Sequence, residues 1–291
     1  MMRPAAGRRV PAMGSRVSAP RPDATGPSGA APLPGPARRE RSLALSILSV
    51  LLFAGVLYAI WEAISRLALV PDIILPAPIE VAQGFGNELA NGELLANMAT
   101  TLQEALGGFA LAAMVAGTLG YLIAHLRWLE VLAAPAIAAS QAVPAVAVAP
   151  ILITLFGVGL LPKVLVCAVV VVFPLLINTV TGLRGIERDY HDVARVFGAS
   201  RLQTLWHLEL PLAAPALLGG LKLGLSLSIV GAVVGEFVAA DSGLGFMINT
   251  SIGNFDNATR YVALITLAGL SISLFGLVTL LERITLRWQE A

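Results

Sequence analysis

The fold that this 291-residue sequence predicts is an all-α membrane protein with six transmembrane helices. Hydrophobic residues make up 57% of the chain and charged residues only 13%, with a mean hydropathy of +0.81. Soluble domains carry about 25% charged residues. Several stretches approach the roughly 20 apolar residues that a helix needs to cross a bilayer. Because lipid cannot hydrogen-bond exposed backbone groups, helices are the expected form of these spans.

Residues 1–40 form a separate region that we expect to be a disordered tail. Eight prolines and five glycines fall there, with seven arginines and few large apolar residues. Such a segment buries too little apolar surface to offset the entropy of ordering the chain. No apolar run precedes Leu43, which argues against a secretory signal, and the prolines interrupt the amphipathic helix of a transit peptide. Met13 is an alternative start.

Six apolar stretches follow within a transmembrane domain at residues 41–291. They cover residues 43–64, 99–124, 131–156, 163–183, 217–239 and 261–281. Prolines mark the third and fourth spans, and the carbonyl that each one frees must find a neighbouring helix or water. Kinks of this kind shape cavities, and Gln141 beside Pro144 is a polar candidate for a pathway wall. Glu104, near the start of the second span, is expected at the interface.

The distribution of Lys and Arg predicts the orientation of the spans. If the N-terminus lies inside, the outer segments hold only Arg66, Lys163 and Arg260, and the inner segments hold the other 16 of the 19 cations. This asymmetry is the positive-inside pattern. Both termini and the loop at residues 185–216 are therefore expected on the cytoplasmic side.

That loop contains the most informative run for function, DVARVFGASRLQTLWHLELP at residues 192–211. Asp192 and Val193 open a helix, and Gly198 can stop it by adopting the left-handed conformation. Ala199 and Ser200 then start a second helix with Ser200 as its N-cap. The second helix presents the apolar side chains of Leu202, Leu205, Trp206, Leu208 and Leu210, and Pro211 is expected to end it because proline lacks an N–H.

A short helix between two turns suits the groove of a soluble partner. The alternative is an amphipathic helix on the inner leaflet, with Trp206 and His207 at headgroup level. The segment has no glycine-rich phosphate loop ending in Gly-Lys-Ser/Thr, so ATP hydrolysis by this chain is not indicated. Neither a catalytic set nor a metal-binding spacing is apparent in the sequence, and no cofactor or nucleic-acid partner is expected.

The 192–211 run resembles the signature loop of ABC-importer permeases, which reads EAA, three residues, Gly, nine residues, Ile, any residue, Leu-Pro. Asp192, Val193 and Ala194 take the place of EAA, and Gly198 follows at the right spacing. Leu208, Leu210 and Pro211 close the pattern. The departures are Asp for Glu, Val for Ala and Leu for Ile. Three further stretches resemble the nitrate, sulfonate and taurine group of these permeases: Leu-Pro-x-Pro at 75–78, Asn-Thr-x-x-Gly-Leu at 178–183 and Gly-Leu-Gly at 243–245.

The resemblance covers residue 43 to the C-terminus and implies a permease in a bacterial inner membrane. It implies a homodimer, two cytoplasmic ATPase subunits that dock on the 185–216 loop, and an extracytoplasmic solute-binding protein. The solute is expected to be an organic anion such as a sulfonate or taurine, or nitrate. The alternative cargo is a vitamin precursor such as a pyrimidine or a riboflavin-like solute. The outer segment at residues 71–98 is either a solvated connector or part of the surface that meets the binding protein.

The fifth span carries a second pattern, a stripe of small residues on one helix face. The stripe consists of Gly220, Gly224, Ser228, Gly231 and Gly235, and Glu236 follows it directly. Small residues let membrane helices approach closely. The stripe therefore indicates packing within one subunit, a subunit interface or a pathway wall. A carboxylate in an apolar span is costly, so Glu236 is expected to make structural hydrogen bonds. The alternatives are that it lines a pathway or that it reaches the interface near the outer end of the helix.

Two other classes of protein compete with an ABC permease. An ATP-independent secondary transporter is expected to show repeated halves and intramembrane charges for ion coupling. The sequence shows no half-repeat and few midspan charges. A structural membrane scaffold would have no use for the docking pattern at residues 192–211.

Overall fold

The computed structural model describes residues 36–71, 73–140, 142 and 144–286, so the predicted tail, except for its last residues, lies outside the described part. All regular elements in the described part are helical. The helices are α1 (Pro36–Arg66), α2 (Pro78–Ala90), α3 (Glu93–His125), α4 (Arg127–Ser140), α5 (Ala145–Phe156), α6 (Leu160–Arg184), α7 (Arg188–Val196), α8 (Arg201–Thr204), the π-helix η1 (Leu205–Glu209), α9 (Leu210–Val238), α10 (Leu244–Gly253) and α11 (Asn257–Thr285). The chain divides into two compact units at residue 57, inside α1, and each unit is described by itself.

Five helices in the described residues are long and apolar enough to cross a membrane. They are Leu48–Arg66, Glu93–His125, Leu160–Arg184, Arg201–Val238 and Asn257–Thr285. Each of these helices overlaps one of the six predicted spans, and only the third predicted span has no counterpart among them. The second unit, from residue 58 on, contains the last four of these helices.

The third predicted span is wrong as a continuous helix, because residues 131–156 belong to two shorter helices, α4 and α5. Pro144 is the N-cap of α5 and has an extended backbone, with φ −65° and ψ 126°. A proline disfavours the helical conformation of the residue before it. Pro135 and Pro150, in contrast, lie inside α4 and α5 without ending them. Gln141, the predicted pathway residue, lies outside the described residues.

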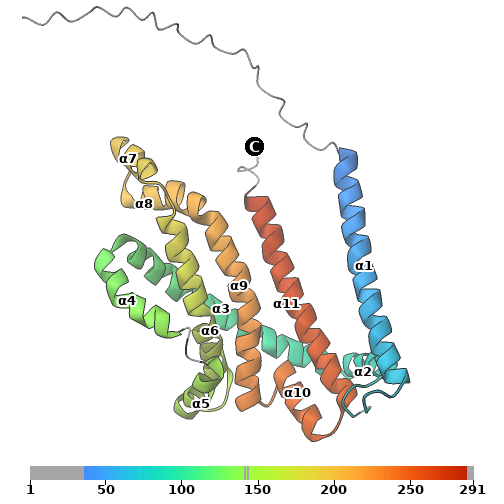
Figure 1. Cartoon of the computed structure of the whole chain (residues 1–291). Helices are drawn as coiled ribbons and strands as arrows, with labels where there is room; N and C mark the ends of the chain where they lie inside the picture. The colour runs from blue at the N-terminus through green and yellow to red at the C-terminus, as the bar shows by residue number, and fades with distance from the viewer. Residues whose placement is uncertain (1–35, 72, 141, 143, 287–291) are drawn as a thin grey trace, which may run out of the picture. The chain divides into compact units, whose positions relative to one another are not determined.

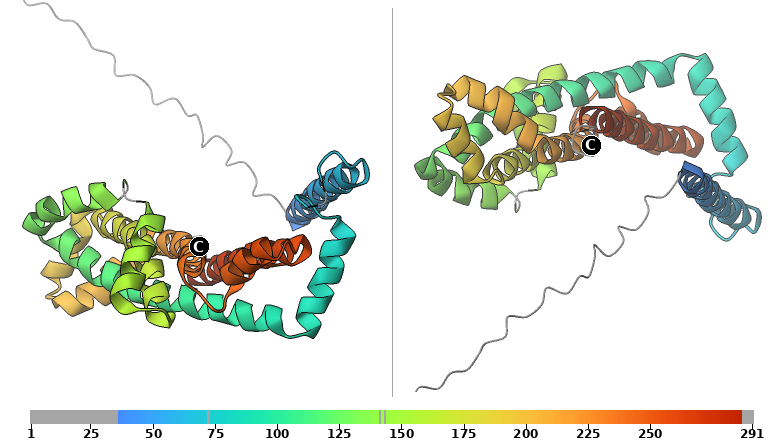
Figure 2. Two further views of the ribbon diagram at one scale, coloured as in Figure 1. Left: turned by 90° about the horizontal axis from the view of Figure 1, so that it is seen from below. Right: turned by 90° about the horizontal axis from the view of Figure 1, so that it is seen from above.

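The centre of the second unit is formed by α3, α6 and α9, which pack against one another. In Figures 1 and 2, α3 crosses beside α6, α9 and α11, with α7 and α8 at one end of the bundle and α10 at the other. We call these the α7 end and the α10 end. Gly108 of α3 permits the close approach to α6, since a Cβ there would collide with Cys167. Cys167 is fully buried and is a small core residue.

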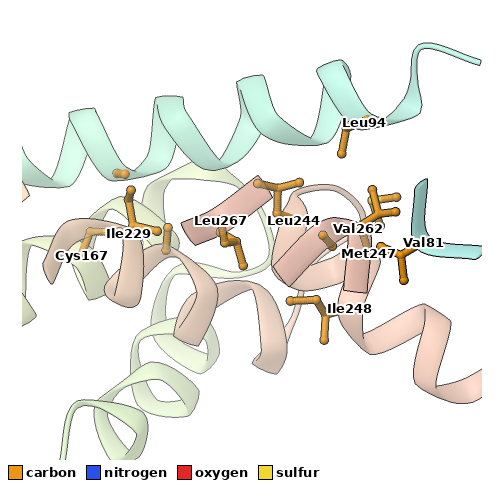
Figure 3. Close-up of a cluster of buried hydrophobic side chains, with 12 residues drawn as sticks. Val81, Leu94, Cys167, Ile229, Leu244, Met247, Ile248, Val262 and Leu267 are labelled. Carbon is orange, nitrogen blue, oxygen red and sulfur yellow. The ribbon is translucent and has the colours of Figure 1, made fainter. Parts of the chain in front are cut away.

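A hydrophobic core extends from this centre to the α10 end. Figure 3 shows its side chains, among them Leu94 of α3, Leu244 of α10 and Val262 of α11. Leu244 and Val262 are fully buried. A second cluster, built around Val171, fills the space between α3 and α6.

The segment between α1 and α2 is held by aromatic side chains. Trp61 Nε1 donates to the carbonyl of Pro76 at 3.0 Å, and the Tyr261 hydroxyl donates to the carbonyl of Ile74 at 3.1 Å. The two rings lie 6.0 Å apart between centroids. The Leu-Pro-x-Pro stretch at 75–78 is non-helical up to Ala77, and Pro78 is the first residue of α2, where its missing N–H costs nothing.

Candidate functional site

The residues of the predicted docking run form two short helices at the α7 end. α7 begins at Arg188, four residues before Asp192, and ends at Val196, with Phe197 as its C-cap and Gly198 next, whose φ is +72°. The Gly198 N–H donates to Arg195 O and the Ala199 N–H donates to Ala194 O, both at 3.0 Å. This is a Schellman C-cap, which favours glycine because of its left-handed backbone. A Cβ on Gly198 would meet nothing within 4 Å, so conformation alone demands glycine here.

Ser200 starts the second helix as its N-cap, as predicted. The Gln203 N–H donates to Ser200 Oγ at 3.3 Å, and the Ser200 N–H donates to Gln203 Oε1 at 2.8 Å. This reciprocal pair is a capping box, which satisfies two backbone donors that a helix start leaves free. The turn between α7 and α8 is therefore bounded by defined hydrogen bonds on both sides, those of the C-cap of α7 and those of the N-cap of α8.

The prediction that Pro211 ends this helix is wrong. α8, η1 and α9 follow one another directly, so a helical segment runs from Arg201 to Val238. The Leu210 N–H donates to Leu205 O, across five residues, and this π-turn directly precedes Pro211. A proline inside an α-helix loses one hydrogen bond, and its ring clashes with the carbonyl four residues earlier. The wider π-turn separates these groups, and Pro211 then occupies the first turn of α9.

The exposed apolar side chains of the predicted docking run, residues 192–211, differ in part from those expected. Leu202 and Trp206 are exposed as predicted, whereas Leu205 and Leu210 line a cavity among α3, α6 and α9. Val196 and Phe197 are 86% and 84% exposed, and sequence reasoning missed them. Val196 is the last residue of α7 and Phe197 is its C-cap, directly before the left-handed Gly198.

The three histidines, which lie far apart in the sequence, do not behave alike in the structure. His125, the last residue of α3, and His191 of α7 both contact one oxygen of Glu209, at 3.0 and 3.3 Å. His207 instead contacts the carbonyl of Gln203 at 3.1 Å. No group of His, Cys, Asp and Glu in the described residues has the geometry of a metal site.

A polar cleft of about 1120 Å³ adjoins this contact, between the ends of α3 and α6 and the helices α4, α7 and α8. Its cations include Arg127, Arg188 and Arg201. Arg184 pairs with Glu130 across the cleft and donates to the carbonyl of Ile123 at 2.9 Å. The hydrogen bond from Arg184 holds the pKa of Glu130 below its usual range.

A second group of polar side chains is buried near the α10 end. Lys163 Nζ of α6 donates to Glu104 Oε1 of α3 at 2.8 Å, and both side chains are at most 3% exposed. Glu104 was expected at the interface, and that expectation is wrong. The reason is its partner, since a buried carboxylate is tolerable when a cation pairs with it. The second oxygen of Glu104 has no hydrogen-bond partner among the described residues.

Glu236 of α9 lies in the same buried group and makes hydrogen bonds. Thr101 Oγ1 donates to its Oε1 at 2.7 Å, and the Gly245 N–H donates to its Oε2. The Leu244 N–H donates to Thr101 Oγ1 at 2.8 Å. A Cβ on Gly243 or Gly245 would overlap the Glu236 carboxylate. The Gly-Leu-Gly turn thus encloses a carboxylate, which explains why these two positions hold glycine.

The small-residue stripe of α9 faces α6 of the same chain. A Cβ on Gly220 would lie 2.7 Å from Cβ of Asn178, and one on Gly231 would lie 2.7 Å from Cα of Cys167. All five stripe residues are buried, including Gly224, Ser228 and Gly235. Three roles were considered for the stripe. The contact with α6 corresponds to the first of them, close helix packing within one subunit.

Comparison with known proteins identifies the class. Residues 116–286, more than half of the chain, match the family described as binding-protein-dependent transport system inner membrane component. The chain belongs to this family, and it is the permease subunit of an ABC importer, a multi-pass inner-membrane protein without enzymatic activity of its own. An ABC importer also contains ATPase subunits and a solute-binding protein.

Several relatives have named functions. The chain is 49% identical over 235 residues to the riboflavin transport system permease protein RibX of Chloroflexus aurantiacus, covering 81% of this chain and 88% of the relative. It is 31% identical to the putative aliphatic sulfonates transport permease protein SsuC of Bacillus subtilis, covering 83% and 87%. It is 30% identical to the formylaminopyrimidine transport permease protein ThiX of Halalkalibacterium halodurans, covering 82% and 95%.

A solved structure supports the fold. A chain of the MetNI methionine ABC transporter, in an inward-facing conformation, matches with a TM-score of 0.55 and 19% identity, covering 66% of this chain and 94% of the other. At this identity the match concerns the fold alone.

Proposed function

We propose that the segment at residues 185–216 docks on the ATPase subunits of this importer. The main support for the proposal is the structure at the tip of this segment, the turn between α7 and α8. There, the capped end of α7 and the capped start of α8 hold exposed apolar side chains in a fixed arrangement. Phe197, Leu202 and Trp206 are each more than 60% exposed. An apolar group rimmed by charge, here by Arg195 and Asp192, is typical of a protein-interaction surface. A helix of this kind inserts into a groove of its partner.

The proposal includes an orientation. Arg184, Arg188, Arg195 and Arg201 all lie at the α7 end, and such an excess of cations favours the cytoplasmic side. The proposal puts both termini on the cytoplasmic side as well, because the positive-inside pattern of the sequence favours it. The α10 end, with the buried Glu236, then faces the external binding protein. Two copies of the chain form the membrane part, as the resemblance to this class of importer implies.

The proposed cargo is a small organic solute delivered by the binding protein. The first candidate class is an organic anion such as a sulfonate or taurine, or nitrate, and the relatives include a putative sulfonate permease. The second candidate is a riboflavin-like or pyrimidine solute, favoured by the 49% identity to a riboflavin permease. The cavity among α3, α6 and α9 has a volume of about 530 Å³ and is lined by apolar residues apart from Thr118, Thr179 and Tyr121. This lining can contact the flat ring of a riboflavin-like or pyrimidine solute, whereas it offers no cation to pair with a small anion.

The docking proposal is tested by replacing Gly198 with valine. A β-branched residue at φ +72° carries about 1–3 kcal/mol of backbone strain, so the turn between α7 and α8 should change shape. We expect Gly198→Val to insert in the membrane but to lose co-purification with the ATPase subunit. Gly276→Val is the control, because Gly276 also meets nothing within 4 Å but lies inside α11. Equal retention of the ATPase by both variants would contradict the docking proposal.

The cargo proposal is tested on the purified binding protein of this importer. Titration calorimetry with riboflavin, a formylaminopyrimidine, taurine and nitrate separates the two candidate classes. Binding of riboflavin or the pyrimidine alone would support the second candidate, and binding of taurine or nitrate alone would support the first.

A further inference from the structure

Glu209 is a buried carboxylate between α7 and the bundle. It is 3% exposed, at the end of the π-turn η1. Its Oε1 lies 3.0 Å from Nε2 of His125 and 3.3 Å from Nε2 of His191, both within hydrogen-bond distance. These two residues lie 84 and 18 positions away in the sequence, so the carboxylate joins three separate elements. Its Oε2 is buried without a hydrogen-bond partner among the described residues.

The contacts of His125 tie the end of α3 to Glu209. Nδ1 of His125 lies 2.9 Å from the carbonyl oxygen of Tyr121, and Nε2 lies 3.0 Å from the Glu209 carboxylate. A hydrogen bond to a carboxylate is stronger than a hydrogen bond between two neutral groups.

The other neighbours of this contact are mostly cationic. Arg188 and Arg195 of α7 and Arg201 of α8 line the adjoining cleft, as do Arg127 and the Arg184–Glu130 pair from α4 and α6. Glu209 is thus the buried anion in a basic surrounding. Removing it would leave two imidazoles and several guanidinium groups facing one another without that anion.

From this geometry we infer that Glu209 is a positioning residue for transport, holding α7, the first helix of the proposed docking segment, to the inner end of α3 through His191 and His125. The inference rests on the proposed docking function of residues 185–216. The apolar side chains Val193 and Val196 of α7 are exposed, so they supply little packing against the bundle. The polar link through Glu209 therefore sets where α7 stands when it meets the ATPase.

The test uses the full-length permease in lipid nanodiscs and the purified ATPase subunit as the probe. The first measurement is hydrogen exchange of the backbone amides at residues 188–196. In Glu209→Ala we expect exchange there to rise about tenfold or more, since a hydrogen bond to a charged group contributes at least that factor. The amides of α9 at residues 220–231 should keep their protection. The second measurement is the affinity for the ATPase subunit, which should fall by about 2- to 30-fold.

Matched variants separate positioning from general destabilisation. Glu130→Ala removes a carboxylate from the same cleft without touching α7, and should leave both measurements unchanged. Glu209→Gln keeps an oxygen that accepts from an imidazole N–H, and should recover most of the ATPase affinity. His191→Ala should reproduce the exchange pattern of Glu209→Ala, because it removes the α7 side of the same link.

Unchanged exchange at residues 188–196 in Glu209→Ala would overturn the inference. So would faster exchange throughout α9, which would make Glu209 a general stability residue. If exchange in α7 of Glu209→Ala is faster but the affinity for the ATPase subunit is unaltered, the role of Glu209 in transport is overturned. The behaviour of Gly198→Val then shows whether the docking proposal has failed too. If Gly198→Val also keeps the ATPase, the docking proposal has failed, and if it loses the ATPase, only the role of Glu209 has failed.

Discussion

The buried pair of Lys163 and Glu104 gives the sharpest stability prediction. Replacing Lys163 with methionine keeps an unbranched side chain of similar length but leaves the Glu104 carboxylate without a cation in the core. Glu236 lies in the same buried group, so the uncompensated charge has a second carboxylate beside it. Breaking a buried ion pair by removing one partner costs about 3–5 kcal/mol. For a domain of this size, about 2–4 °C are lost per kcal/mol, so Tm should fall by roughly 6–20 °C.

The assay is thermal unfolding of the detergent-purified permease, followed by tryptophan fluorescence and by the monodisperse fraction on gel filtration. Lys222→Met is the matched control, because Lys222 pairs with Glu282 at a site where the side chains are 17% and 26% exposed. A partly exposed pair contributes about 0–1 kcal/mol. Its loss should therefore lower Tm far less than the loss of Lys163.

A double variant tests the cause of the effect. Glu104→Met combined with Lys163→Met replaces both charges by apolar groups of similar length, a change that is often neutral or stabilising by about 1–4 kcal/mol in buried pairs. The double variant should therefore be more stable than Lys163→Met alone. If Lys163→Met lowers Tm no more than Lys222→Met, or if the double variant is no better than the single one, the reasoning from an uncompensated buried charge is refuted.

Two further predictions concern glycines. Gly245→Ala would place Cβ 2.6 Å from Glu236 Oε2, so we expect a loss of about 1–3 kcal/mol from overpacking in thermal unfolding, whereas Gly253→Ala, in open space, should be close to wild type. Gly231→Leu should separate α9 from α6 and reduce the yield of folded protein on gel filtration. Gly219→Leu on the open side of the same helix is its control, and equal yields would refute the contact.

Features that depend on a short run of residues could be predicted from the sequence. The left-handed turn at Gly198 and the cap at Ser200 are local, because the glycine conformation and the serine hydrogen bonds involve only neighbouring positions. The apolar spans follow from composition in the same way. The break in the third span was missed, because Pro144 carries the same local signal as Pro150, which α5 tolerates.

Contacts between distant segments could not be predicted. Lys163 pairs with Glu104, which lies 59 positions away in the sequence, and Glu209 contacts His125, which lies 84 positions away. Each residue alone fits the interface or a loop, where charged side chains in membrane proteins are usual. Only the packing of α3 against α6 and α9 makes these positions buried and supplies their partners.

The Leu-Pro pair at residues 210–211 shows how a local rule fails for a physical reason. A proline ends a helix when its ring and the carbonyl four residues earlier compete for the same space. The π-turn at Leu205–Glu209 adds a residue at that point, so the backbone hydrogen bond closes across five residues and the ring is accommodated. π-turns are rare and occur often at functional sites. Here the same turn carries Glu209 into the core, so the helix continues through its proline at the residue that we infer positions α7.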